Sequence, residues 1–119
     1  MKYFGKLAAI LIFICLAGCA PSDANPSRAQ ELLQQGAILV DVRTQSEYDS
    51  GHLEGSIHLP YERILELAKQ AGVEKNTPVV LYCQSGRRSG IAKQSLEQAG
   101  YTNVHNGGGY QALSESLRK

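Results

Sequence analysis

The chain lacks tryptophan, is poor in cysteine and carries no excess of charge of either sign. Its 119 residues include 12 Lys or Arg and 11 Asp or Glu, for a formal net charge of +1 at pH 7. Proteins that bind nucleic acid usually present a strongly basic surface to the phosphate backbone, so this balance argues against that class of partner. The three cysteines include no C-x-x-C pair, which excludes a zinc ribbon and a thioredoxin-type motif, and three thiols cannot form a framework of paired disulfides.

The first 18 residues are predicted to be an export signal rather than part of the fold. Lys2 and Lys6 precede eleven uninterrupted apolar residues, 7–17. A membrane-spanning helix needs about 20 apolar residues, so this run is too short to span and has the pattern of a secretory signal peptide.

The end of this segment, Leu16-Ala17-Gly18-Cys19, resembles the lipobox of bacterial lipoproteins. In that family the signal is removed before the cysteine, which then carries lipid, and several acyl chains together anchor a protein stably. The resemblance implies an exported protein attached through Cys19 to the periplasmic face of a bacterial membrane. Ala20 stands where lipoproteins retained in the inner membrane have Asp, so the outer membrane is favoured. An ordinary signal peptide and a soluble periplasmic protein are the alternative.

Residues 19–26 are small, polar and interrupted by proline, which is typical of a tether, and residues 27–119 form the predicted domain. Removal of the signal eliminates Cys15, and lipidation occupies Cys19. Cys83 is then the only free thiol of the exported protein.

Four stretches of the predicted domain have the pattern of strands. Runs rich in branched apolar residues predict strands buried on both faces over 37–42 and 79–82. Shorter strands are predicted over 56–59 and 104–105, and the glycines of 107–109 predict a turn.

Helices are predicted between these strands. The first is expected to open at a Ser27/Gln30 capping box and to end at Gly36, and a second capping box, Thr44/Glu47, opens one or two helical turns. Such alternation implies a mostly parallel sheet covered by helices on both faces. The remaining predicted helices cover 61–71, 89–99 (with Ile91, Ala92, Ser95, Leu96 and Ala99 on one face) and the segment marked by Tyr110, Leu113 and Leu117.

The candidate catalytic residue is Cys83, at the carboxyl end of the second buried strand. Ligands of open α/β sheets bind at this edge, and a loop leading into a helix offers backbone N–H groups to an anion. A thiol there is expected to have a lowered pKa, helped by Arg87 and Arg88, and Gly86 gives the loop backbone angles that other residues resist. An inert, buried cysteine is the alternative that composition alone leaves open.

Several motifs, in order along the chain, resemble single-domain rhodaneses. Over residues 27–119 the chain is similar to that family, and most of all to its small exported members. The resemblance implies a three-layer α/β fold with a mostly parallel central sheet of four to five strands; the fifth strand rests on the resemblance. The motifs are Asp41-Val42-Arg43, Glu47-Tyr48, the stretches 51–60 and 82–89, Ala99-Gly100-Tyr101 and the stretch 106–110.

The resemblance also implies an activity, that of a thiosulfate:acceptor sulfurtransferase. Cys83 would take the sulfane sulfur of thiosulfate as a persulfide and pass it to a thiophile, either cyanide or a thiol. No metal or cofactor is implied, no protein partner is indicated, and His52, His58 and His105 match no ligand spacing. Arg87 is expected to face the substrate, while Arg88 is as compatible with a solvated surface. The residues expected to bind substrate are Gln84, Ser85, Gly86, Arg87, Arg88 and Ser89.

Two other classes stay open. A rhodanese module without turnover would bind a partner or carry sulfur, although this chain keeps the cysteine. A cysteine phosphatase or arsenate reductase needs Cys-x5-Arg, and Ser89 stands at the arginine position. Away from the loop, Asp41 and Arg43 are expected to orient the sheet-edge loops, and Glu47 and His52 to serve as cap and turn residues.

Overall fold

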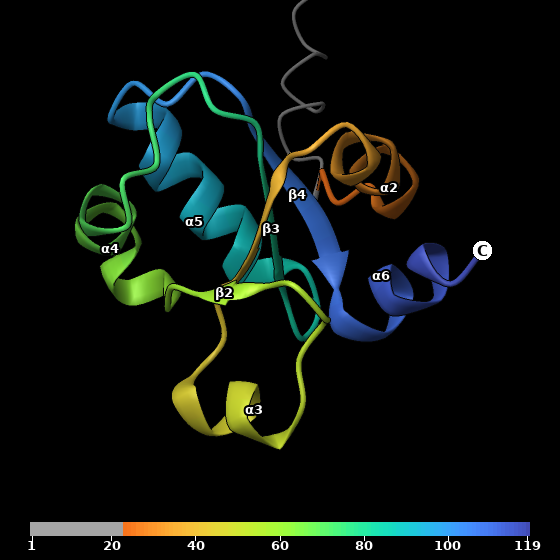
Figure 1. The fold of residues 1–119 in the computed structure, drawn as a ribbon. Coiled ribbons are helices and arrows are strands. Elements are labelled where there is room, and N and C mark those ends of the chain that lie inside the picture. The colour runs from red at the N-terminus through yellow and green to blue at the C-terminus, as the bar shows by residue number, and fades with distance from the viewer. Residues whose placement is uncertain (1–22) are drawn as a thin grey trace, which may run out of the picture.

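The computed structural model describes residues 23–119 (Figure 1). The predicted signal peptide, the lipidation site Cys19 and the first half of the predicted tether, residues 19–22, lie outside the described residues. No helix within residues 23–119 is long and apolar enough to cross a membrane. The elements are α2 (Pro26–Gln34), β1 (Ile38–Asp41), α3 (Gln45–Ser50), β2 (Ile57–His58), the 3-10 turn η2 (Tyr61–Arg63), α4 (Ile64–Gln70), β3 (Val79–Cys83), α5 (Arg87–Gln98), β4 (Val104–Gly109) and α6 (Tyr110–Leu117).

The four strands form one parallel sheet in the order β2-β1-β3-β4. Helices α4 and α5 cover one face of this sheet, and α2 and α6 cover the other (Figure 1). The α/β fold with a parallel sheet between two helical layers is therefore confirmed. Helix α3 lies at the end of the sheet where β1 finishes, beside the edge at which a ligand is expected (Figure 1).

Strand β3 is at the centre of the core, as its apolar sequence predicts. All five of its residues are buried. Alternation along the strand divides them between the two layers: Leu81 and Cys83 belong to the cluster under α4 and α5, and Val80 and Tyr82 to the cluster under α2 and α6. The thiol of Cys83 is thereby directed to the side from which α5 begins.

Two helix starts differ from those predicted. Helix α2 begins at Pro26 and is capped by Asn25, whose side chain accepts a hydrogen bond from the Arg28 N–H at 3.0 Å, so the Ser27/Gln30 capping box is wrong. Asn is among the strongest N-caps, and proline suits the first helical position. Helix α5 begins at Arg87, two residues early, because Gly86 caps it in the left-handed conformation with φ of 94°. The Thr44/Glu47 capping box is confirmed.

The buried stripe of α5 is narrower than predicted. Ser89, Ala92 and Leu96 are buried, but Ile91 is 39% exposed. The predicted helix over 61–71 is likewise shorter, because its first turn is the 3-10 turn η2.

The glycines of 107–109 form part of β4 rather than a turn. A Cβ on Gly107 would lie 2.8 Å from Val80 Cγ1, and a Cβ on Gly109 would lie 2.7 Å from the Gln84 carbonyl oxygen. Glycine lets β4 run this close to β3 and to the loop after it, with a register irregularity between Leu81 and Tyr82.

No fifth strand is present within the described residues. Residues 23–25 lie instead against the outer strand β4, where the Asn25 N–H donates to the Asn106 carbonyl oxygen at 2.9 Å. The segment before α2 is thus attached to the sheet next to the Cys83 loop.

Candidate active site

The loop after β3 folds tightly around the sulfur of Cys83. The chain leaves the sheet at Cys83 and enters α5 at Arg87, so three residues make the turn. Gly86, in the left-handed conformation, is buried, and a Cβ there would lie 3.3 Å from Gly108 Cα. The glycines of β4 and Gly86 therefore let the loop rest directly on the neighbouring strand.

Two donors point at the thiol. The Gly86 N–H donates to Cys83 Sγ at 2.9 Å, and the Ser89 hydroxyl lies 3.6 Å from the same sulfur. Cys83 and Ser89 are both fully buried. The sulfur consequently lies in a cradle of donors at the N-terminus of α5, a helix of 12 residues.

This environment lowers the pKa of the Cys83 thiol. Burial alone raises that pKa, but hydrogen bonds from the backbone and hydroxyl of Ser89 and from the backbone of Ser85 and Gly86 outweigh it. The positive end of the helix dipole acts in the same direction. A thiolate, the nucleophilic form of cysteine, is thus favoured at this position.

The two arginines of the loop have different surroundings. Arg88 forms a two-pronged ion pair with Glu47 of α3, with distances of 2.9 and 3.1 Å. It is half-buried, so the interpretation of Arg88 as a solvated surface residue is wrong. Arg87 is exposed, and its guanidinium makes no ion pair within residues 23–119. An unpaired cation at the loop is consistent with the expected substrate-facing role of Arg87, which stays a prediction.

Glu47 does more than cap a helix. Its carboxylate accepts hydrogen bonds from Arg88, from the Thr44 N–H at 2.9 Å and from the Thr44 hydroxyl at 3.1 Å. The Arg88 hydrogen bond is the largest cause that lowers the pKa of Glu47 to about 2. The sequence indicated the cap, but gave no signal of this link between α3 and α5.

Asp41 and Arg43, at the end of β1, orient the Cys83 loop through hydrogen bonds, as the sequence predicts. Arg43 donates to both carboxylate oxygens of Asp41, to Gln84 Oε1 at 3.1 Å and to the Gly51 carbonyl oxygen at 2.7 Å. Both partners of this ion pair are buried. Tyr82, which the sequence marked only as core, donates its hydroxyl hydrogen to Asp41 Oδ2 at 2.8 Å. The side chain of Gln84 is therefore held in place by Arg43, in addition to the constraint that the loop places on its backbone.

One residue near the sulfur was not singled out from the sequence. Asn106 of β4 is buried; its Oδ1 accepts from the Ser89 hydroxyl at 2.7 Å, and its Nδ2 donates to the Gly86 carbonyl oxygen at 3.0 Å. It precedes three glycines in the sequence, and only the position of β4 beside the loop shows what it contacts.

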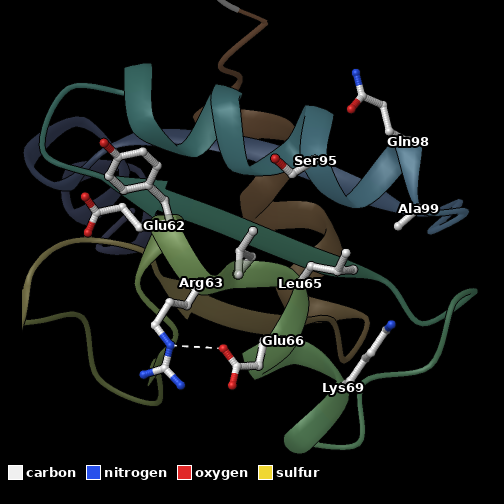
Figure 2. A pocket seen from close by; sticks show the side chains of 10 residues that line it. Glu62, Arg63, Leu65, Glu66, Lys69, Ser95, Gln98 and Ala99 are labelled. Carbon is white, nitrogen blue, oxygen red and sulfur yellow. Dashed lines mark hydrogen bonds and ion pairs between the residues drawn. The ribbon is translucent and has the colours of Figure 1, made fainter.

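A hollow of about 620 Å³ opens beside the loop, lined by Ser85, Gly86 and Arg87, and by Asn106 and Ile91 among others. A groove of about 680 Å³ lies between α4 and α5, where Arg63 and Glu66 form an exposed ion pair (Figure 2). No residue of the Cys83 loop lines that groove. Of the two cavities, the hollow of about 620 Å³ is the one next to the Cys83 loop.

No group of three or more His, Cys, Asp or Glu side chains that could hold a metal ion occurs in the part of the chain that the structure describes. The chemical equipment of the site is thus a free thiol of lowered pKa, converging N–H and O–H donors and an exposed guanidinium. Such a set favours attack by sulfur on an anionic substrate.

Comparison with known proteins gives one consistent result. The model of the rhodanese-like domain matches residues 25–116. The thiosulfate sulfurtransferase PspE of Escherichia coli K12 is 39% identical over 75 residues, which cover 63% of this chain and 72% of that protein. The thiosulfate sulfurtransferase GlpE of Pseudomonas syringae pv. syringae is 36% identical over 87 residues, 72% of this chain and 80% of that protein. A solved structure described as a rhodanese with anions from E. coli superposes with a TM-score of 0.61 at 38% identity, over 64% of this chain and 89% of that one.

Proposed function

Since the chain belongs to the rhodanese-like family, we propose that it is a thiosulfate:acceptor sulfurtransferase in which Cys83 carries the transferred sulfur. The observation that supports this most is the state of Cys83: a buried thiol of lowered pKa, surrounded by donors at a helix N-terminus. The same features argue against a module that lacks turnover, because an inert thiol would need none of them.

In the proposed reaction, the Cys83 thiolate attacks the sulfane sulfur of thiosulfate. A new sulfur–sulfur bond forms, the sulfur–sulfur bond of thiosulfate breaks, and sulfite leaves with its electron pair. A thiophile, cyanide or a thiol, then attacks the outer sulfur of the Cys83 persulfide. Thiocyanate or a new persulfide is released, and the thiolate is regenerated in a two-step, ping-pong cycle.

The loop residues have separable roles in this scheme. The N–H groups of the loop and the Ser89 hydroxyl stabilise negative charge on the Cys83 sulfur and on its persulfide. Arg87, exposed at the hollow beside the loop, attracts the dianionic donor. Arg88 is held by Glu47 and keeps the start of α5 in place.

A phosphatase or arsenate reductase reaction is not supported by the same loop. Those enzymes hold a tetrahedral oxyanion with an arginine six residues after the cysteine. Ser89 occupies this position, is fully buried and is hydrogen-bonded to Asn106, so the site offers no guanidinium there. We therefore expect negligible hydrolysis of aryl phosphates beside measurable transfer from thiosulfate to cyanide.

For location, we propose a lipoprotein anchored through Cys19 at the periplasmic face of a bacterial membrane, as the lipobox resemblance suggests. Asp23 is four residues from Cys19, a span of at most about 14 Å in extended chain. Asp23 also contacts Asn106, beside the Cys83 loop. Such an anchor would keep the sulfur-transfer site close to the lipid surface.

Mass spectrometry of the intact mature protein tests the assignment of Cys83. Thiosulfate should add one sulfur atom, about 32 Da, and cyanide or dithiothreitol should remove it. Cys83→Ser should abolish both the adduct and transfer to cyanide, while Ser95→Ala, a substitution on α5 at a distance from the thiol, should change neither. An adduct or transfer activity that persists in Cys83→Ser would overturn the proposal.

A further inference from the structure

The amide of Asn106 uses every hydrogen-bonding position it has. Its Oδ1 accepts from the Ser89 hydroxyl at 2.7 Å and from the Gly108 N–H at 2.9 Å. Its Nδ2 donates to the Gly86 carbonyl oxygen at 3.0 Å and to Asp23 Oδ1 at 3.3 Å. A flipped amide would set NH2 against the Gly108 N–H and oxygen against the Gly86 carbonyl, so the orientation of the side chain is fixed.

This fixed orientation creates a competition for one hydrogen atom. The Ser89 hydroxyl has a single hydrogen and two acceptors within reach, Asn106 Oδ1 at 2.7 Å and Cys83 Sγ at 3.6 Å. Asn106 Oδ1 can only accept, so the hydrogen between the two oxygens must come from Ser89. This one hydrogen cannot form a full-strength hydrogen bond to Oδ1 and to Sγ at the same time. A neutral thiol is a weak acceptor and loses this competition, whereas a charged sulfur is a strong one.

We propose that Asn106 is a positioning residue of the sulfur-transfer site: it holds the Ser89 hydroxyl beside Cys83 and takes up the hydroxyl hydrogen whenever the sulfur is uncharged. When the thiolate forms, the O–H bond turns to the sulfur without movement of any heavy atom. This role rests on the proposed function of Cys83 as sulfur carrier, but it is measured on the thiol itself, without thiosulfate.

Charged groups from several elements surround Cys83 and Asn106. Arg88, the cation that acts on Cys83 from α5, is paired with Glu47, whose pKa is about 2. His105, beside Asn106 on β4, has a pKa lowered by burial and by nearby cations. The other charged groups around the loop and Asn106 are the Asp41–Arg43 pair, the Asp23–Lys93 pair with Glu97 beside it, and the exposed Arg87 of the loop itself.

The experiment is a double-mutant cycle on the ionisation of Cys83. Thiolate absorbance is followed with pH in the mature protein, and the signal of the Cys83→Ser counterpart is subtracted so that only this thiol is read. Ser89→Ala should raise the midpoint by about half to one pH unit, because the thiolate loses a donor. Asn106→Ala should lower it by about half a unit, because the hydroxyl no longer has a rival acceptor.

The decisive comparison is Asn106→Ala in the Ser89→Ala background, where it should leave the midpoint unchanged. An equal displacement in both backgrounds would show that Asn106 acts only through the general shape of the loop, and would overturn the proposal. Asn103→Ala, directly before β4, and Ser95→Ala on α5 are the matched controls, and neither should move the midpoint. Circular dichroism verifies that each variant is folded.

If Asn106→Ala does not fold, the same question is answered without substituting that residue. The side-chain amide resonances of Asn106 should move with the Cys83 midpoint in the wild-type protein and move at most half as far in Ser89→Ala. The thiolate charge on Cys83 forms in both proteins. The wild type and Ser89→Ala therefore differ only in whether the Ser89 hydroxyl connects Cys83 to Asn106. Equal movement in the two would refute the role of Asn106, whereas an absent persulfide in the thiosulfate experiment would refute the proposed function alone.

Discussion

The ion pair between Glu47 and Arg88 links helix α3 to the first turn of α5, and its removal should weaken the fold in a pH-dependent way. Glu47→Gln is the informative substitution. A glutamine at this helix position still reaches back to the Thr44 N–H, so the capping box is kept. Only the negative charge opposite Arg88 is lost.

The magnitude follows from the pKa of Glu47, which falls from 4.5 to about 2. At 1.36 kcal/mol per pKa unit this corresponds to about 3 kcal/mol as an upper bound. The two side chains are 22% and 31% exposed, so solvent screens the pair, and we expect a loss of about 1–2 kcal/mol on substitution. For a domain of this size such a loss lowers Tm by about 4–16 °C.

The sign with pH is fixed by the direction of the shift. A carboxylate whose pKa is lowered in the folded state stabilises the fold fully above its unfolded value of 4.5 and loses this effect as the pH falls towards 2. Thermal unfolding of wild type and Glu47→Gln should therefore differ most near pH 6 and converge near pH 2. Glu66→Gln, which removes the exposed pair with Arg63, is the control and should leave Tm unchanged. A difference as large at pH 2 as at pH 6 would contradict the electrostatic reasoning.

Three further substitutions probe other parts of the chain. Arg87→Ala should keep the thiosulfate adduct but lower kcat/KM for thiosulfate about five- to thirtyfold through KM, and unchanged steady-state kinetics would assign the anion contact to another group. Tyr82→Phe should destabilise the domain by about 1–3 kcal/mol in urea unfolding, because the buried Leu53 N–H and Asp41 both lose the Tyr82 hydroxyl as a partner; no change in the midpoint would be the contrary result. Cys19→Ser should release the protein from the membrane fraction or block its processing, and a wild-type protein found wholly in the soluble periplasm would contradict lipidation.

Local features of the chain were predictable from the sequence. The uninterrupted apolar runs identified β1 and β3, and the Thr44/Glu47 pair identified the start of α3, because each depends on residues close together in the chain. The position of Cys83 at the end of β3 followed from the same local pattern.

Features that depend on packing were not predictable in this way. The glycines of 107–109 have the composition of a turn, and only the close approach of β4 to Val80 and to the Gln84 carbonyl shows why a strand needs them. The partners of Arg88 and Asn106 come from α3 and from the Cys83 loop respectively, far away in sequence. Such contacts are set by strand order and helix placement, which no short motif encodes.

At Ser89, six residues after Cys83, the local sequence and the packing of the fold both inform the function. From the sequence, Ser89 counts against an arginine-clamped oxyanion site, and the resemblance to rhodaneses favours sulfur as the group transferred. The structure adds that this serine is buried, that its hydroxyl points between Cys83 and Asn106, and that its backbone helps to lower the pKa of the thiol. A guanidinium there would neutralise the several charged oxygens of a phosphate, whereas one hydroxyl hydrogen is enough for a sulfur that carries a single charge. The same residue that argues against phosphate chemistry is thus well suited to stabilise the Cys83 thiolate.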